Sequence, residues 1–370
     1  MHSDLLHALA RKDVLQLGAY NAGLSDEAVR KTWQVETISR LASNENPLGA
    51  SPRVQQALQH SNPRSAIYPD AASGELRAAL AVATGVTADC IAIGNGSEEL
   101  LKLLCLAFIN SGDRVVTLLP SFGLHQLYPQ LMGAQVDLVP VDDQMEYDLP
   151  AWEQALSRPA KMVIISNPSN PVGCMLGQAG FQRLIDAAPA DALLVIDEAY
   201  FEYCAGLAEY PDSLSVLRQQ SRPWIVLRTF SKAYGLAGLR VGYGLASNAA
   251  LVDLLNRVRT PFNINRAAQA AALAALDDQQ HVRDSVAYVV AQRDWLTAEL
   301  QPLVVQLAPS QANFLFFRIA GDGAELARKL LASGIIVKPW LEPGYRDWIR
   351  VSIGSAADNQ RFIAALRQVL

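Results

Sequence analysis

The chain has 370 residues, 51% of them hydrophobic and 18% charged, with a formal net charge of −5. This composition is typical of a globular protein that buries a large core and divides into two domains. No run of five basic residues occurs, which excludes a broad basic surface. We therefore expect neither nucleic acid nor a membrane as a partner.

The cysteine and histidine spacings argue against disulfides and metals. The four cysteines form no Cys-x-x-Cys pair and the five histidines no His-Glu-x-x-His motif, so we expect reduced thiols, no metal and a cytoplasmic protein. Each histidine is interpreted as a surface residue or a satisfied core residue. The N-terminal MHSDLLHALARKD lacks the long apolar segment of a signal peptide, and no apolar stretch approaches the roughly 20 residues of a membrane span.

Residues 1–45 are predicted to form an initial helix and an extended arm, and residues 46–258 one large α/β domain. The apolar runs of this domain are continuous rather than alternating, which is typical of strands covered by helices on both faces. Longer amphipathic segments separate them. We therefore expect a mainly parallel sheet with strands at residues 90–94, 114–119, 135–141, 161–166, 192–197, 224–229 and 240–246.

Residues 259–370 are predicted to form a smaller α+β domain. Helical segments broken at Pro261 come first. Strands at residues 311–319, 335–339 and 348–355 then alternate with helices at 323–334 and 357–370. No long linker separates the two domains, so we expect them to lie close together.

Gly96 and Ser97 lead from the first predicted strand of the large domain into a helix. Unpaired backbone N–H groups and the helix dipole favour a phosphate at such a position. A simple helix cap, with Ser97 as the capping residue and an acid in the first turn, explains the same residues without a ligand. The stretch lacks the Gly-x-Gly-x-x-Gly pattern of a dinucleotide site.

Asn170 and Asp197 follow or end two further strands of the same sheet. A tight turn accounts for the Asn-Pro pairs around Asn170, although its side chain would also donate to a polar atom of a bound ring. A carboxylate at the end of a buried strand is unfavourable unless a cation pairs with it. Asp197 is therefore predicted either to contact a protonated ring nitrogen or to cap a helix.

Lys232 follows the strand at 224–229, and Arg240 comes eight residues later. Burial lowers the pKa of a lysine amine and suits it to Schiff-base chemistry; an ordinary surface lysine is the alternative. In open α/β sheets, ligands bind outside the carboxyl ends of the strands. Together the motifs supply a phosphate cradle, a ring-nitrogen partner, polar ring contacts and an amine nucleophile, which is the set that pyridoxal phosphate needs.

The ordered motifs resemble those of the fold-type I pyridoxal-phosphate aminotransferases and, among them, the histidinol-phosphate aminotransferase group. The resemblance covers nearly the whole chain. It rests on LASNENPLG (41–49), IYPD (67–70), GNGSEE (94–99), SNPSNPVG (166–173), IDEAY (196–200), LRTFSKAYGLAGLRVGYG (227–244), PFNINRAAQ (261–269), SQANFLFF (310–317) and IRVSIGS (349–355). It implies an aspartate-aminotransferase-like fold, pyridoxal 5′-phosphate as cofactor, and histidinol-phosphate:2-oxoglutarate transamination in histidine biosynthesis.

The resemblance also implies a role for each matching residue. Lys232 would bind the cofactor covalently and move the Cα proton, while Asp197 would pair with the ring nitrogen. The other ring contacts would come from Tyr200, Asn170 and Phe122. The cofactor phosphate would be bound by Gly96, Ser97, Glu98, Thr229 or Ser231, Arg240 and Tyr68 of the partner subunit, which implies a homodimer with shared active sites. The substrates, amino and keto acids, would contact Arg350, Lys338, Tyr20 and Asn44.

Two departures leave the reaction type intact but leave the substrate open. Where the histidinol-phosphate group usually carries Val-Arg-Asp, this chain has Val337-Lys338-Pro339-Trp340, and it has Ala22 where proline is common. Lysine offers a point charge in place of the arginine fork. Because Trp340 beside the site would favour an aromatic amino acid, the alternatives are an aromatic-amino-acid aminotransferase or a threonine-phosphate decarboxylase.

Two further classes of protein require sequence features that this chain lacks. A nicotinamide oxidoreductase, suggested by GLAGLRVGYG, needs a glycine-rich turn after the first strand and an acid near the second, and neither is present. A non-catalytic pyridoxal-phosphate regulator needs a DNA-binding domain, but only about 45 residues precede the core and they contain no basic recognition helix.

Overall fold

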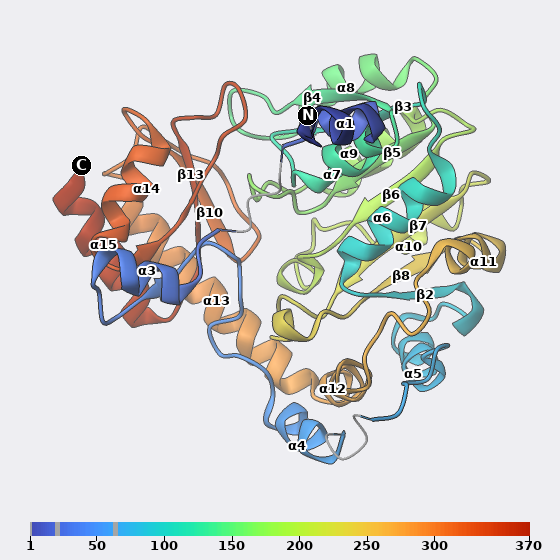
Figure 1. Cartoon of the computed structure of the whole chain (residues 1–370), viewed down its shortest axis with the longest axis horizontal. Coiled ribbons are helices and arrows are strands. Elements are labelled where there is room, and N and C mark those ends of the chain that lie inside the picture. The colour runs from blue at the N-terminus through green and yellow to red at the C-terminus, as the bar shows by residue number, and fades with distance from the viewer. Residues whose placement is uncertain (1, 19–22, 62–65) are drawn as a thin grey trace.

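The computed structural model describes residues 2–18, 23–61 and 66–370, in which two units lie side by side (Figure 1). The larger unit is built on a seven-stranded sheet with the strand order β2-β8-β7-β6-β5-β3-β4. Its strands are β2 (Ile91–Gly94), β3 (Arg114–Leu119), β4 (Gln135–Pro140), β5 (Met162–Ser166), β6 (Leu193–Asp197), β7 (Trp224–Thr229) and β8 (Gly242–Ala246).

The sheet is parallel except for β8, which runs antiparallel to both of its neighbours, β2 and β7. The strands β3 to β7 pair in parallel. This confirms the predicted mainly parallel sheet and each of its seven strands. Because β2, β5, β6 and β7 share one direction, their carboxyl ends lie at the same edge of the sheet, where β8 begins.

Alternate residues of each strand enter two apolar clusters, one on each face of the sheet. In β5, Val163 and Ile165 belong to one cluster, and Met162 and Ile164 to the other. The second cluster is covered by α6 (Ser97–Phe108), α7 (Leu124–Leu131) and α11 (Ala249–Val258). The first is covered by α4 (Pro52–Ser61), α5 (Gly74–Thr84), α8 (Leu149–Leu156), α9 (Gln178–Ala187), α10 (Ser213–Leu217) and α12 (Arg266–Leu276). Burial on both faces is the reason that the strands are continuously apolar.

The C-terminal unit contains a four-stranded antiparallel sheet with the order β12-β13-β10-β9. Its strands are β9 (Gln306–Leu307), β10 (Phe314–Arg318), β12 (Lys338–Pro339) and β13 (Trp348–Ser352). Its helices are α13 (Gln279–Leu300), α14 (Gly323–Leu331) and α15 (Ala356–Val369). Phe314, Phe316 and Phe317 of β10 belong to the same apolar cluster as one face of the large sheet, so the core is continuous between the units.

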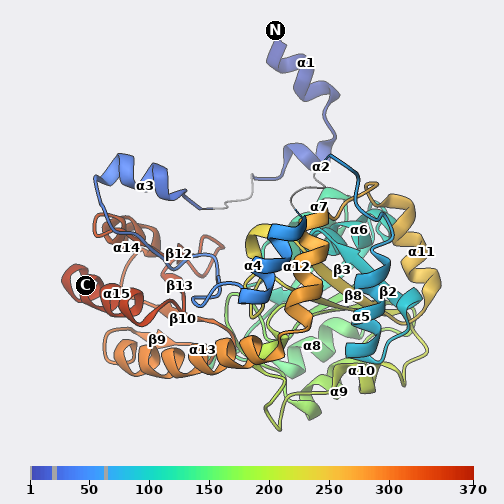
Figure 2. The same ribbon diagram turned by 90° about the horizontal axis from the view of Figure 1, so that it is seen from below.

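The N-terminal segment comprises α1 (His2–Leu9), α2 (Lys12–Leu15), α3 (Asp26–Trp33) and β1 (Ser39–Arg40). Helix α1 projects away from the rest of the chain (Figure 2). Strand β1 pairs in parallel with β11 (Ile335–Ile336), and Ser39 Oγ donates to Asp358 Oδ1 at 2.6 Å. The arm is therefore bound to the C-terminal unit, and the division of the chain at residues 45 and 258 stays a prediction.

Candidate active site

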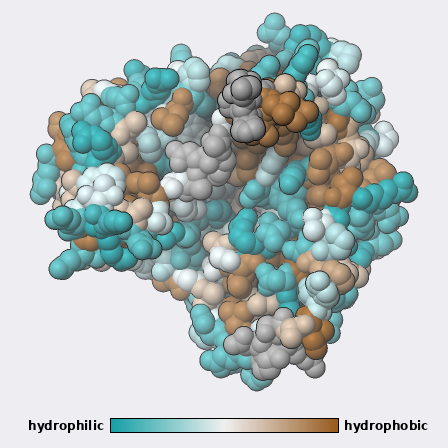
Figure 3. Space-filling view, viewed as in Figure 1, coloured by the Kyte–Doolittle hydropathy of each residue, from teal (hydrophilic) through white to brown (hydrophobic). Residues whose placement is uncertain are grey.

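A cavity of about 490 Å³ lies at the carboxyl edge of the large sheet and is closed on its other side by the C-terminal unit. The surface is hollowed between the two units (Figure 3). The cavity is lined by fourteen of the sixteen predicted site residues: Asn44, Gly96, Ser97, Glu98, Phe122, Asn170, Asp197, Tyr200, Thr229, Ser231, Lys232, Arg240, Lys338 and Arg350. Motifs far apart in the sequence therefore meet because parallel strands end together.

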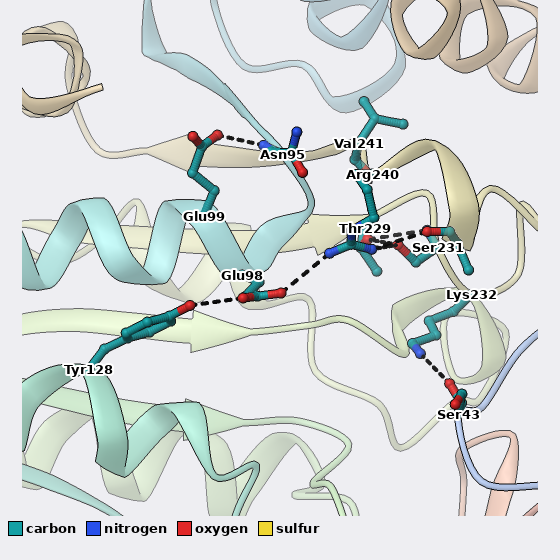
Figure 4. A network of polar contacts seen from close by, with 11 residues as sticks. Ser43, Asn95, Glu98, Glu99, Tyr128, Thr229, Ser231, Lys232, Arg240 and Val241 are labelled. Carbon is teal, nitrogen blue, oxygen red and sulfur yellow. Dashed lines mark hydrogen bonds and ion pairs between the residues drawn. The ribbon is translucent and has the colours of Figure 1, made fainter. Parts of the chain in front are cut away.

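Lys232 is half-buried in this cavity, three residues beyond the end of β7. Its Nζ donates to the Ser43 carbonyl at 3.1 Å (Figure 4). Burial, together with the nearby positive charge of Arg350, lowers the pKa of the Lys232 amine to about 7. In a large fraction of the molecules the Lys232 amine is thus uncharged at neutral pH, so it is available as a nucleophile and a base.

Asp197, the last residue of β6, has a hydrogen-bonding partner that the sequence did not reveal. His125 Nε2 lies 2.8 Å from Asp197 Oδ2, and His125 Nδ1 lies 3.0 Å from Ser121 Oγ. Asp197 Oδ1 also accepts from the Ala199 backbone N–H at 3.1 Å, which is a local turn contact and not the helix cap given as the alternative. His125 is thus a satisfied core histidine, as expected, but its contact with Asp197 was not predicted. The available signal was its spacing of three residues from Phe122, which places the two on one turn.

The start of α6 supplies unpaired backbone donors at the cavity. The residue before the helix is Gly96, with φ at +77° and no side-chain cap, while Ser97 is already helical. The interpretation of Ser97 as the capping residue is therefore wrong. A side chain at Gly96 would come within 2.6 Å of Arg240 Nη2, so only glycine leaves room here for the guanidinium.

Arg240 and two hydroxyl groups face the same helix start (Figure 4). Arg240 Nη1 lies 3.4 Å from Ser231 Oγ, which accepts from Thr229 Oγ1 at 3.0 Å. The Glu98 carboxylate lies 3.4 Å from Arg240 Nη2 and accepts from Tyr128 at 2.8 Å. Its side chain is thus an acidic partner of Arg240, and only its backbone N–H suits a bound anion.

Polar contacts link the two units across the cavity floor. Asn44 Nδ2 donates to Tyr200 Oη at 2.9 Å, and Arg350 Nη1 donates to Asn170 Oδ1 at 2.6 Å. Arg350 comes from β13 and is only 7% exposed. Its guanidinium also donates to the Ala42 carbonyl at 2.5 Å. The arm, the large sheet and the small sheet therefore each contribute side chains to one site.

Lys338 pairs with Arg350 across β12 and β13, so both side chains lie on one face of the small sheet. Burial and the neighbouring Arg350 lower the pKa of Lys338 to about 8. Trp340 does not line the cavity in the part of the chain that is described. Its ring packs edge-on against Phe316 at 5.8 Å, and its Nε1 donates to Glu342 at 2.6 Å. The Trp340 ring also lies 6.0 Å from the Arg350 guanidinium, so it stands beside the site, as expected, but outside the cavity lining.

The remaining predicted residues lie in three different places. Phe122 lines the cavity and meets the His125 ring edge to face at 5.5 Å. Tyr68 is 75% exposed, stacks on Phe262 at 4.4 Å and lies outside the cavity of its own chain. Tyr20 lies outside the described residues.

Two negative findings hold for residues 2–18, 23–61 and 66–370. No three histidine, cysteine, aspartate or glutamate side chains among them are grouped as metal ligands. No helix among them has the length and apolar character needed to cross a membrane.

Comparison with known proteins places these observations in a family. Residues 36–366 match the family model of the class I and II aminotransferases. The chain is 44% identical to histidinol-phosphate aminotransferase 3 of Rhizobium meliloti over 97% of both chains. It is 45% identical to histidinol-phosphate aminotransferase 1 of Mesorhizobium japonicum over 98% of both.

Solved structures show the same relationship. The histidinol-phosphate aminotransferase from Sinorhizobium meliloti, solved in complex with pyridoxal-5′-phosphate, superposes with a TM-score of 0.89 at 28% identity over 98% of this chain and 97% of the other. A Thermus thermophilus aspartate aminotransferase variant shares the fold with a TM-score of 0.83 at 22% identity, over 98% of this chain and 99% of the other. The match over residues 36–366 and the near-complete coverage of these relatives show that the chain belongs to the class I and II aminotransferase family.

Proposed function

We propose that this protein transfers the amino group of histidinol phosphate to 2-oxoglutarate, using pyridoxal 5′-phosphate bound at Lys232. The observation that carries the proposal is the placement of the Lys232 amine, with its pKa lowered to about 7, in a cavity between Asp197 and the start of α6. The names of the relatives and the complex with pyridoxal-5′-phosphate support it.

The residues of the cavity suit this cofactor. Its phosphate would be held by the uncapped N–H groups at the start of α6, by Arg240 and by the hydroxyls of Thr229 and Ser231. Gly242 keeps this cradle open, because a Cβ there would come within 2.7 Å of the Gly96 backbone carbon. The ring would lie beside Asp197, with the aromatic face of Phe122 and the polar groups of Tyr200 and Asn170 around it.

The bound cofactor would supply an electron sink that stabilises negative charge at the substrate Cα. Lys232 would hold the cofactor through its uncharged amine, and the same amine, when free, would accept the Cα proton of the substrate as a general base. Asp197 would place its carboxylate group beside the ring nitrogen and so favour the protonated nitrogen. His125 holds the Asp197 carboxylate in place through its 2.8 Å contact.

The cations of the C-terminal unit suit an anionic substrate. Arg350 and Lys338 line the same wall of the cavity, where a substrate phosphate or carboxylate would pair with both. The aromatic-amino-acid alternative depended on Trp340, whose ring packs against Phe316 and beside the Arg350 guanidinium but does not line the cavity among the described residues. The histidinol-phosphate reaction is therefore the one that we propose.

The site would be completed by a second copy of the chain. Tyr68 lies outside its own cavity, and Ile67, Tyr68 and Phe262 expose 64%, 75% and 40% of their surfaces. Such a group of exposed apolar side chains is typical of an interface. A homodimer would cover it and carry the partner's Tyr68 toward the cofactor phosphate. We further propose that the dimer acts in the cytoplasm.

Visible absorption of the purified protein, before and after borohydride reduction, tests cofactor binding. We expect a yellow protein whose visible band disappears on reduction and is missing from Lys232→Ala. A colourless wild-type protein that pyridoxal phosphate does not reconstitute would overturn the proposal. Steady-state assays with histidinol phosphate and with phenylalanine, each with 2-oxoglutarate, test the substrate. We expect turnover of histidinol phosphate, and its absence would refute that part.

A further inference from the structure

We propose that Arg328 of α14 binds the outer oxygens of the substrate phosphate and thereby selects a phosphate monoester over an α-amino carboxylate. This inference deepens the proposed function and rests on it for the identity of the substrate.

One face of α14 forms part of the cavity wall. Ala324, Ala327, Arg328 and Leu331 all line the cavity, and their spacing of three and four residues places them on one side of a helix. The helix also packs against β12 and β13, the strands that carry Lys338 and Arg350. Three of the four lining residues are alanine or leucine, so Arg328 is the polar feature of this face.

The C-terminal unit presents cations to the cavity at different depths. Arg350 is 7% exposed, Lys338 is half-buried, and Arg328 is exposed at the rim. The described residues that line the cavity include two acids, Glu98 and Asp197, and both come from the large unit. The charged side chains that the C-terminal unit presents to the cavity are therefore all cations among the described residues, which favours an anion that reaches from the floor toward the rim.

The neighbouring lysine shows that Arg328 differs from an ordinary surface charge. Lys329 Nζ lies 3.8 Å from Glu325 Oε1, and neither residue lines the cavity. Within the described chain, Arg328 has no carboxylate at ion-pair distance and is directed to the cavity instead. The guanidinium fork suits a phosphate better than an ammonium does, because it donates two parallel hydrogen bonds.

The chemistry of the substrate explains why a cation at the rim discriminates. In histidinol phosphate the phosphorus lies two bonds further from the reacting amine than the carboxylate carbon of an α-amino acid does. A carboxylate held by Arg350 and Lys338 would end short of the rim, while a phosphate would extend past them. Arg328 would then contact the phosphate and leave an α-carboxylate untouched.

Steady-state kinetics of Arg328→Gln test the inference on the holoenzyme. We expect KM for histidinol phosphate to rise roughly tenfold or more with kcat nearly unchanged, because a charged hydrogen bond to substrate is lost while the reacting groups stay in place. KM for glutamate should stay within about twofold of wild type, and Arg328→Lys should recover part of the loss. Lys329→Gln is the matched control, since it removes the same charge from the next residue of the helix.

Equal KM values for histidinol phosphate in Arg328→Gln and Lys329→Gln would overturn the inference, as would equal losses for histidinol phosphate and glutamate.

Inorganic phosphate gives a test that does not depend on the proposed function. Calorimetry of the wild-type holoenzyme, whose cofactor cradle is already filled, should show phosphate binding that Arg328→Gln weakens about threefold or more and Lys329→Gln does not. If the wild type fails to turn over histidinol phosphate but shows this difference, the proposed substrate is wrong and the role of Arg328 stands. Identical phosphate affinities in both variants would refute the role itself.

Discussion

His125 Nε2 lies 2.8 Å from Asp197 Oδ2, and both side chains are buried at the carboxyl edge of the large sheet. This contact joins α7 to β6 and fixes the carboxylate beneath the cavity. Ser121 holds the other ring nitrogen at 3.0 Å, so the imidazole cannot turn away from Asp197 without breaking a second bond.

Replacing His125 by leucine should lower kcat by roughly 10-fold to 100-fold, because a buried hydrogen bond to a charged group contributes about 1.5–3 kcal/mol. Steady-state assays at saturating substrate would measure the change. His60→Gln is the control, since the exposed His60 contacts the Gln56 carbonyl of its own helix α4. A leucine variant as active as the control would show that the contact does not support catalysis.

The lowered pKa of Lys232 predicts a dependence of stability on pH. Its folded value is about 7 against an ordinary 10.5, so between these values the unfolded chain binds a proton that the folded chain lacks. The contribution of Lys232 to the free energy of unfolding therefore rises with pH between about 7 and 10.5. Below pH 7 the Lys232 amine is charged in both the folded and the unfolded chain, so the full cost of burying its charge destabilises the folded state.

Lys232→Met should therefore stabilise the cofactor-free protein most below pH 7 and progressively less as the pH approaches 10. Urea unfolding of both proteins across this range would measure the difference in the free energy of unfolding. A difference that does not change with pH would contradict the lowered pKa. Lys329→Met, on the exposed surface, should show no such trend.

Gly242→Ala should destabilise the protein by about 1–3 kcal/mol and weaken cofactor binding, because overpacking displaces neighbouring backbone. The added Cβ would overlap the Ser97 backbone nitrogen and come within 2.9 Å of the Arg228 carbonyl. Thermal unfolding and a titration with pyridoxal phosphate would measure both effects. Gly238→Ala is the matched control, since a Cβ there meets nothing within 4 Å. Equal behaviour of the two variants would refute the packing argument.

Glu198→Gln should destabilise the protein by about 3–5 kcal/mol, because it leaves the charge of Arg228 buried without its partner. The two groups lie 2.8 Å apart with side-chain exposures of 1% and 8%. Asp347→Asn breaks an exposed pair with Arg318 at 2.7 Å and should change stability by no more than about 1 kcal/mol. Chemical denaturation would compare the free energies of unfolding of the two variants. A smaller decrease for Glu198→Gln than for Asp347→Asn would show that the buried pair does not stabilise the fold as argued.

Much of the fold and of the site was predictable because it depends on local patterns. Continuous apolar runs indicated strands covered on both faces, and parallel strands must end at one edge. The positions of Asp197, Lys232 and the start of α6 followed from that rule. The capping role of Ser97 was wrong, because Gly96 occupies the position before the helix and Arg240 fills the space beside it.

The sequence by itself determined where the strands lie along the chain, the edge at which the site lies and most of the residue types that meet there, since these follow from periodicity and chain direction. Only the tertiary structure decided the partners. It brought His125 to Asp197, turned Trp340 into the core against Phe316, and placed Arg328 on the cavity face of α14. Side chains distant in sequence meet through the packing of helices and sheets, and no local pattern in the chain encodes that geometry.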